Sequence, residues 1–254
     1  MGTAWNCDRD DYVAYGSLFR RNTKERYSGG VKMIRVKNVS KSFKRQQILK
    51  DINLEVKEGT ICGIIGRNGS GKTVLFKCIC GFFLTDSGKI EVQGKEVGKN
   101  YKNRELGLII EEPGFLKHYS GYKNLAFLMG LNGKVDRKKI YETLKLVGLY
   151  EERNKAVGKY SMGMKQRLGI AQAIMEGQTV LILDEPMNGL DNEGVMAMRK
   201  LFLQLKQQKK TILLASHSYE DIAVLCDEVY EMDKGFLKKI EFPKIEELME
   251  LRSL

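Results

Sequence analysis

The sequence has no long hydrophobic run. No stretch approaches the roughly 18 consecutive apolar residues that a membrane-spanning helix requires. The opening residues, MGTAWNCDRDDYVAYG, contain no apolar core segment and so do not resemble a secretory signal. Asn6 stands where an N-myristoylation motif requires Ser or Thr. These absences lead us to expect a soluble protein on the cytoplasmic side of the membrane.

Cysteine is also scarce, and its spacing excludes two common uses. The five cysteines form no C-x-x-C pair, and their odd number argues against a disulfide framework. Cys62 falls in an apolar strand pattern, whereas Cys78 and Cys80 fall in a helical one. We therefore expect reduced, buried thiols, as in a cytosolic protein. The remaining two are Cys7 and Cys226.

Positive charge, by contrast, is plentiful. The 254 residues include 43 Lys and Arg against 32 Asp and Glu, which gives a formal net charge of +11. Such a balance is compatible with nucleic acid, anionic lipid or phosphate-rich ligands. However, no basic run extends beyond a few residues, so lysines scattered over solvated faces explain the excess equally simply. Charge alone does not identify a partner.

The pattern of the chain divides it into three parts. Residues 1–32 are polar and show no periodicity, so whether they belong to the working protein stays open. Residues 33–235 carry the regular patterns, with an inserted helical subdomain at about 111–164 where apolar residues recur at helical spacing. Residues 236–254 are expected to form a C-terminal tail that is partly helical.

Short apolar runs alternate with helical patterns through the main part of the chain. TICGIIG, TVLILDEP and KTILLASHS read as strands that are covered on both faces. Strands alternating with helices predict an α/β fold with a mostly parallel central sheet and helices on both faces. Two alternating segments, MIRVKNVSKSF and ILKDINLEV, come earlier and predict a separate antiparallel β part at the N-terminal end.

A complete phosphate-binding loop lies between the first buried strand and a predicted helix. The octapeptide GRNGSGKT fits G-x-x-x-x-G-K-[ST] without mismatch, which predicts a P-loop NTPase whose loop wraps around the phosphates of a nucleotide. Lys72 is expected to contact the β- and γ-phosphates and act in catalysis, and the Thr73 hydroxyl to ligate Mg²⁺. The loop residues are Gly66, Arg67, Asn68, Gly69, Ser70, Gly71, Lys72 and Thr73.

Acidic and histidine side chains follow two other buried strands. Asp184 and Glu185 end TVLILDEP, and His217 follows the strand in LLASHS. Because open α/β sheets bind ligands at the carboxyl ends of their strands, all three are expected beside the phosphate loop. Asp184 is a predicted Mg²⁺ partner of Thr73. Glu185 is the predicted base that polarises the attacking water. His217 is the third predicted catalytic residue, expected to contact the γ-phosphate and to hold the water, Glu185 or both in line.

The ordered set GRNGSGKT, YSMGMKQR, LILDEP, NGLD and SHS resembles the ATP-binding cassette of ABC transporters. The resemblance covers about residues 33–235. It implies that YSMGMKQ occupies the place of the family signature LSGGQ, so that Ser161 and Gly163 bind the γ-phosphate held by a partner cassette. Met162 departs from the common form of that signature.

The resemblance also implies roles for three further residues. Phe43 matches the aromatic residue that stacks on adenine, usually Tyr in this family. Asp191 is the acid of NGLD, the loop that communicates across the dimer. Glu111 stands where the family normally has a Gln that ligates Mg²⁺ and senses the permease. A glutamate still offers an oxygen to Mg²⁺, but it adds negative charge near the phosphates.

Several functions are compatible with these motifs. The first is the ATPase subunit of an ABC exporter, peripheral on the inner face of the cell membrane through a separate transmembrane permease. IEEP together with YSMGMKQRLGIA resembles the peptide-antibiotic export or immunity type. The second is a soluble cassette ATPase acting on ribosomes or nucleic acid. That alternative is disfavoured because the chain has neither a second GKT nor sustained heptads. A non-hydrolysing structural partner is disfavoured because all the catalytic residue types are present.

Overall fold

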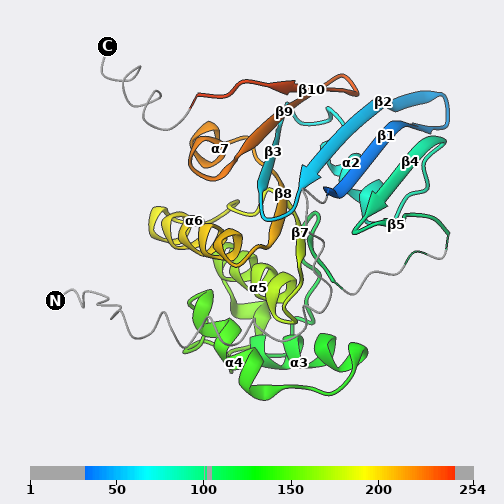
Figure 1. Cartoon of the computed structure of the whole chain (residues 1–254). Helices are drawn as coiled ribbons and strands as arrows, with labels where there is room; N and C mark the ends of the chain where they lie inside the picture. The colour runs from blue at the N-terminus through cyan, green and yellow to red at the C-terminus, as the bar shows by residue number, and fades with distance from the viewer. Residues whose placement is uncertain (1–31, 100, 102–104, 244–254) are drawn as a thin grey trace, which may run out of the picture.

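Two β-sheets and a set of flanking helices make up the protein in the computed structural model, which describes residues 32–99, 101 and 105–243 (Figure 1). The first sheet has the strand order β2-β1-β4-β5, and all its pairings are antiparallel. This sheet confirms the antiparallel β part that alternating polarity predicts. Its strands are β1 (Lys32–Phe43), β2 (Gln46–Lys57), β4 (Ser87–Val92) and β5 (Lys95–Glu96).

The second sheet has six strands in the order β10-β9-β3-β8-β7-β6. The four pairings from β9 to β6 are parallel, and only the β9–β10 hairpin is antiparallel. The continuous apolar runs predict this outcome, since β3 and β8 are buried along their whole length. The strands are β3 (Ile61–Ile65), β6 (Leu106–Ile109), β7 (Val180–Asp184), β8 (Thr211–Ala215), β9 (Glu228–Asp233) and β10 (Phe236–Ile240).

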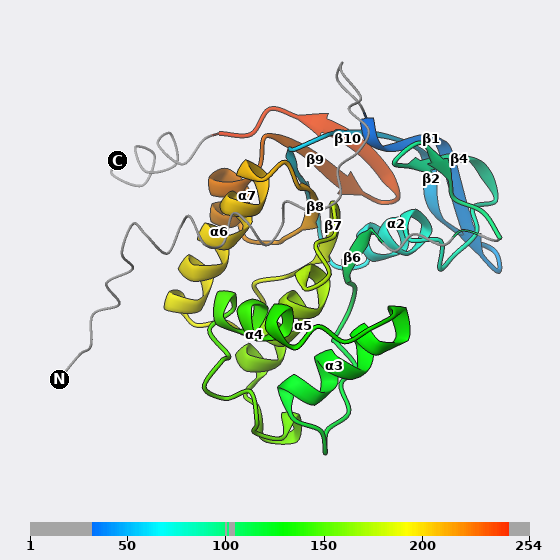
Figure 2. The same cartoon turned by 60° about the horizontal axis from the view of Figure 1, so that its bottom comes forward.

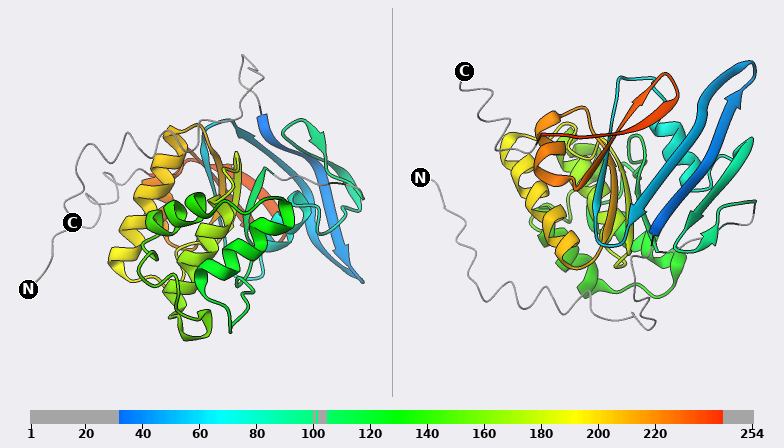
Figure 3. Two further views of the ribbon diagram at one scale, coloured as in Figure 1. Left: turned by 90° about the horizontal axis from the view of Figure 1, so that it is seen from below. Right: turned by 45° about the horizontal axis from the view of Figure 1, so that its top comes forward.

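The helices cover both faces of the six-stranded sheet and extend away from it at one end (Figures 2 and 3). Helices α3 and α4 lie at the end of the molecule away from the antiparallel sheet, as expected for a helical subdomain inserted between β6 and α5. The helices are α2 (Lys72–Ile79), α3 (Gly121–Asn132), α4 (Arg137–Leu146), the short 3₁₀ helix η1 (Val157–Lys159), α5 (Met162–Ile174), α6 (Asn192–Gln207) and α7 (Tyr219–Leu225).

Two hydrophobic clusters hold these layers together, one on each face of the parallel sheet. Side chains alternate between them along β7: Val180 and Ile182 join the cluster that includes α2 and the antiparallel sheet, and Leu181 and Leu183 join the cluster under α5 and α6. Burying both faces of a strand in this way fixes its register, because a one-residue slip would exchange the two sets. The sheet is thus a rigid platform for the loops at its carboxyl edge.

The structure corrects the prediction for the C-terminal end of the chain. The expected tail from residue 236 is wrong at its start, because Phe236–Ile240 is strand β10, whose partner β9 ends only three residues earlier. The Asp233 to Phe236 connection carries Lys234 and Gly235, both at positive φ, which a tight hairpin turn favours. The remaining tail, from 244, and the N-terminal extension to 31 lie outside the described residues.

The cysteines behave as expected wherever the structure describes them. Cys62, Cys78 and Cys80 are buried, Cys226 is partly buried, and all four are free thiols. Cys80 directly follows the last residue of α2 as its C-cap. Burial raises the pKa of the Cys78 thiol to about 11, which keeps it protonated and unreactive at neutral pH. Among the described residues, no helix is both long and apolar enough to cross a membrane.

Candidate active site

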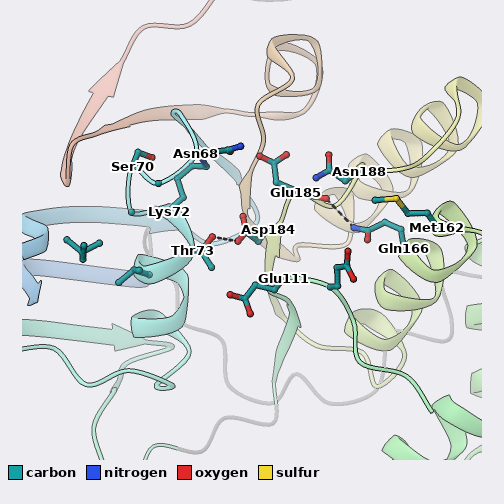
Figure 4. Close-up of a pocket in the computed structure, with 15 residues that line it drawn as sticks. Asn68, Ser70, Lys72, Thr73, Glu111, Met162, Gln166, Asp184, Glu185 and Asn188 are labelled. Carbon is teal, nitrogen blue, oxygen red and sulfur yellow. Dashed lines mark hydrogen bonds between the residues drawn. The ribbon is translucent and has the colours of Figure 1, made fainter. Parts of the chain in front are cut away.

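The loops that follow β3, β6 and β7 meet around one pocket of about 590 Å³ (Figure 4). The parallel arrangement of β3, β8 and β7 brings the carboxyl ends of these strands to the same edge. The pocket lining therefore combines the phosphate loop, the acids after β7 and the loop after β6, as the sequence predicts. The predicted site residues in the lining are Asn68, Gly69, Ser70, Gly71, Lys72, Thr73, Glu111, Asp184 and Glu185.

The phosphate loop has the features of an anion cradle. Gly66 and Gly71 adopt φ values of 151° and 117°, which side-chain-bearing residues rarely adopt. Helix α2 begins at Lys72, within the loop motif, and its N-cap residue Gly71 provides no side-chain hydrogen bond to its first N–H groups. The Ser70 hydroxyl is buried and has no hydrogen-bond partner among the residues that the structure describes. Uncapped amides at a helix N-terminus are a ready phosphate site, so these residues fit a nucleotide triphosphate.

Lys72 supplies the positive charge of the cradle. Only 6% of the residue is exposed. Its ammonium group donates hydrogen bonds to the carbonyl oxygens of Gly66 at 2.7 Å and Arg67 at 3.3 Å. Carbonyl dipoles stabilise a buried cation only in part, because its charge is not neutralised. A bound phosphate would provide that neutralisation, as the sequence motif predicts.

Thr73 and Asp184 lie in direct contact beside this loop. The Thr73 hydroxyl donates to Asp184 Oδ2 at 2.6 Å (Figure 4). Burial raises the pKa of the Asp184 carboxyl above its usual value, while the Thr73 hydrogen bond and the charge of Lys72 oppose that rise. A carboxylate and a hydroxyl are hard oxygen donors of the kind that Mg²⁺ prefers.

These donors do not form a complete metal site by themselves. No group of three or more His, Cys, Asp or Glu side chains able to hold a metal ion occurs in the part of the chain that the structure describes. Mg²⁺ is usually bound through one or two carboxylates together with substrate phosphates and water. The Thr73–Asp184 pair therefore fits Mg²⁺ as part of a metal–nucleotide complex, with the phosphates supplying the missing ligands.

Glu185 and His217 also meet, although they come from different strands. His217 Nδ1 lies 2.8 Å from Glu185 Oε2, and the His217 backbone N–H donates to the same oxygen at 3.4 Å. Glu185 has a φ of 49°, a conformation that non-glycine residues adopt only at some energetic cost. Gln166 Nε2 fixes the same segment by donating to the Glu185 carbonyl at 3.2 Å. The carboxylate is thus held at a defined position above Asp184 and Lys72 (Figure 4).

Ser161, Gly163 and Asp191 lie on a neighbouring surface and do not line the pocket. Ser161 caps helix α5 by accepting a hydrogen bond from the Met164 N–H at 3.2 Å. Asp191 caps α6 and also pairs with Arg167 at 3.2 Å. The structure therefore does not bring Ser161 to the phosphate loop of its own chain.

Gly163 joins these two cap regions through close backbone packing. A Cβ atom added at Gly163 would lie only 2.8 Å from the Gly189 carbonyl oxygen, in the NGLD segment. A Cβ atom added at Gly189 would in turn lie 2.7 Å from Met162 Cγ, and Met162 is itself part of the pocket lining. The two segments that the sequence links to a partner cassette thus form one continuous surface.

Phe43 does not line the pocket. It is 39% exposed at the end of β1. Its ring packs edge-on against Phe83 at a centroid distance of 5.1 Å, and the Lys41 ammonium lies 5.3 Å from it. The ring is therefore partly covered by Phe83 and Lys41 and partly exposed. The adenine-stacking role stays a prediction.

Several lining residues were not predicted from the sequence. Gln166, Asn188 and Glu112 reach the pocket from α5, from the loop after β7 and from the loop after β6. Helical spacing offered a signal for Gln166. Gln166 is four positions after Met162 in α5, so the two side chains share a helix face, and both line the pocket. Lys77 does not line the pocket, but its ammonium lies 2.5 Å from Glu111 Oε1, which does. No sequence pattern distinguished Lys77 from the other lysines of the chain.

The sequence of this chain is similar to those of known proteins. A family model described as "ABC transporter" matches residues 49–188. An uncharacterised ABC transporter ATP-binding protein, YybJ of Bacillus subtilis, is 39% identical over 210 residues, which cover 82% of this chain and 96% of YybJ. The bacitracin transport ATP-binding protein BcrA of Bacillus licheniformis is 40% identical over 214 residues, covering 83% of this chain and 70% of BcrA.

A solved structure supports the same fold. That of cbiO1 from Clostridium perfringens, part of the ABC transporter complex cbiONQ, has a TM-score of 0.72 and 27% sequence identity. The similarity covers 87% of this chain and 92% of cbiO1.

Proposed function

This chain belongs to the ABC transporter family, and from that membership we propose that it is the ATP-hydrolysing cassette of an exporter whose membrane-spanning permease is a separate chain. The observation that carries the proposal is the convergence of Lys72, Thr73, Asp184 and Glu185 on one pocket. These residues come from segments more than a hundred positions apart, and together they supply what phosphoryl transfer to water requires. No observation favours a role on ribosomes or nucleic acid.

Each residue has a distinct part in the proposed reaction. The amides of the phosphate loop and Lys72 hold the β- and γ-phosphates. Thr73 and Asp184 would hold Mg²⁺, which would supply positive charge next to the phosphates. Glu185 orients and polarises the attacking water, and His217 keeps the Glu185 carboxylate in place through the contact at 2.8 Å.

A second cassette would complete this site. Ser161 is exposed, lies at the N-terminus of the 13-residue helix α5, and does not face the pocket of its own chain. We propose that Ser161 and Gly163 bind the γ-phosphate of a partner cassette, so that two ATP molecules lie between two chains. Asp191 adjoins this surface, and we propose that it couples the two nucleotide sites, so that nucleotide binding at one site affects the other.

The helical subdomain is the proposed contact with the permease. Its exposed apolar side chains include Leu116 and Tyr119, which are 47% and 45% exposed in the loop that joins the pocket to α3. A permease segment bound there would connect the nucleotide site to the membrane, and would hold the cassette peripherally on the inner face. Since BcrA is a bacitracin transport protein, we propose a peptide antibiotic as the class of substrate.

ATP turnover by the purified chain tests the proposal. Glu185→Gln should lower turnover by roughly 10²–10⁴-fold while ATP still binds, because the amide cannot act as a base. Lys72→Ala should weaken ATP binding itself. Glu58→Gln and Lys138→Ala are matched controls on exposed surface and should leave both quantities unchanged. Near-normal turnover in Glu185→Gln would overturn the assignment of the base.

A further inference from the structure

Helix α2 presents two polar side chains on the same face, one turn apart. Thr73 and Lys77 are separated by four residues, so they lie next to each other along the helix. Thr73 donates to Asp184, whereas Lys77 forms an ion pair with Glu111 at 2.5 Å. The helix that begins at the phosphate loop therefore binds both acids of the predicted metal site, each through a different residue.

Glu111 is held at this position against its own backbone preference. Its φ is 62°, in the left-handed region that glutamate seldom adopts. The loop after β6 thus places a carboxylate in the pocket lining at a cost in conformational energy. The Lys77 side chain is 22% exposed and that of Glu111 is 63% exposed, so the pair is reachable by water and easily exchanged for another partner.

The pair lies within electrostatic reach of the metal site. The negative charge of Glu111 opposes ionisation of Asp184, and the positive charge of Lys77 favours it. An unpaired Glu111 would therefore add a third carboxylate to the site, with Asp184 and Glu185, and would repel an incoming triphosphate. Lys77 cancels that charge where the family normally has an uncharged glutamine.

We propose that Lys77 is a positioning residue that holds Glu111 on helix α2 in the nucleotide-free cassette and releases it only when Mg²⁺ arrives with ATP. The inference rests on the function proposed above, because it concerns the same nucleotide site. The ion pair with Lys77 makes Glu111 compatible with phosphate binding. Because Mg²⁺ must replace Lys77 as the partner of Glu111, the movement of Glu111 depends on the divalent cation. The loop that joins the pocket to the helical subdomain would move with Glu111.

A double-mutant cycle on nucleotide binding tests this role. The variants are Lys77→Met, Glu111→Gln and the two combined, titrated with a fluorescent, slowly hydrolysed ATP analogue with and without Mg²⁺. In the absence of Mg²⁺, Lys77→Met should weaken binding roughly 3- to 5-fold when Glu111 is present, and less than about 2-fold in the Glu111→Gln background. Glu111→Gln alone should raise the Mg²⁺ concentration needed for half-maximal binding.

Two further variants separate positioning from simple structural support. Lys77→Arg retains the charge and should restore binding close to that of the unaltered chain, whereas Lys138→Met removes an exposed lysine of α4 and should change nothing. If Lys77→Met does not fold, Lys77→Gln takes its place in the cycle. Circular dichroism of each variant verifies the fold.

The outcomes are distinct. A loss of the same size with Glu111 intact and in the Glu111→Gln background would overturn the inference, since the two residues would then act independently. An unaltered chain that binds no ATP analogue under any condition would instead refute the proposed function. Coupling that is present without Mg²⁺ and disappears at saturating Mg²⁺ would support the release of Glu111 from Lys77.

Discussion

Replacing Asp184 by Asn should stabilise the nucleotide-free protein while it abolishes magnesium-dependent function. Burial raises the pKa of Asp184, so the folded protein disfavours the ionised form of this carboxyl. Asn has nearly the same shape, and its carbonyl oxygen can still accept the hydrogen bond that Thr73 donates at 2.6 Å. The substitution therefore removes the disfavoured charge and retains the contact.

The sign of the pH dependence follows from the direction of that shift. Between the unfolded and the higher folded pKa, the native state binds more protons than the unfolded state, so stability falls as pH rises through this window. Above the folded pKa, Asp184 is ionised in both states and its destabilising effect is fully present. Asp184→Asn lacks it and should be more stable by about 1 kcal/mol, a typical gain at a functional site, or roughly 2–4 °C in Tm for a chain of this size.

Thermal unfolding of the unaltered chain and the variant, measured from pH 4 to pH 8 without nucleotide, checks this expectation. The stability difference should be largest at neutral pH and should shrink as the pH falls below the folded pKa of Asp184. Added ATP and Mg²⁺ should raise the Tm of the unaltered chain much more than that of the variant. Glu58→Gln is the matched carboxylate-to-amide control on exposed surface. A variant that is less stable at neutral pH, by an amount independent of pH, would refute the reasoning.

Substitutions at three further positions test other predicted site residues. Phe43→Ala should weaken ATP binding by about 1–3 kcal/mol, the usual contribution of a nucleobase stacked on an aromatic ring. In an ATP-binding titration of both variants, Phe43→Tyr should bind normally. His217→Ala should lower kcat by roughly 10- to 100-fold with little change in ATP affinity, because it frees the Glu185 carboxylate without touching the phosphate loop; equal losses in both quantities would contradict a positioning role. Gly163→Ala should destabilise the protein by roughly 1–3 kcal/mol in urea unfolding, because its Cβ would lie 2.8 Å from the Gly189 carbonyl oxygen.

Much of the fold could be predicted because local and long-range patterns agree. The apolar runs at β3, β7 and β8 identify strands buried on both faces, and parallel pairing then brings the phosphate loop, Asp184 and His217 to one edge. The strand β10 escaped prediction because its sequence, FLKKI, is short, exposed and rich in lysine. A strand at a sheet edge needs no apolar alternation, so its pattern resembles that of a surface helix or a tail.

The site was only partly predictable for a related reason. Motifs identify residues by their spacing along the chain, and this finds Lys72, Thr73 and Glu185. Contacts between segments carry no such spacing. The Lys77–Glu111 pair joins a helix to a loop 34 positions away, and nothing in either segment marks its partner.

The central claim is that two chains share their nucleotides, and the oligomeric state of Glu185→Gln tests it most directly. Size-exclusion chromatography with light scattering would compare this variant without nucleotide, with ATP, and with ATP and Mg²⁺. We expect a monomer without nucleotide and a doubling of the molar mass with ATP, and Ser161→Ala should weaken this doubling. A chain that binds ATP but remains monomeric at every concentration would contradict the claim that Ser161 serves the site of a second copy.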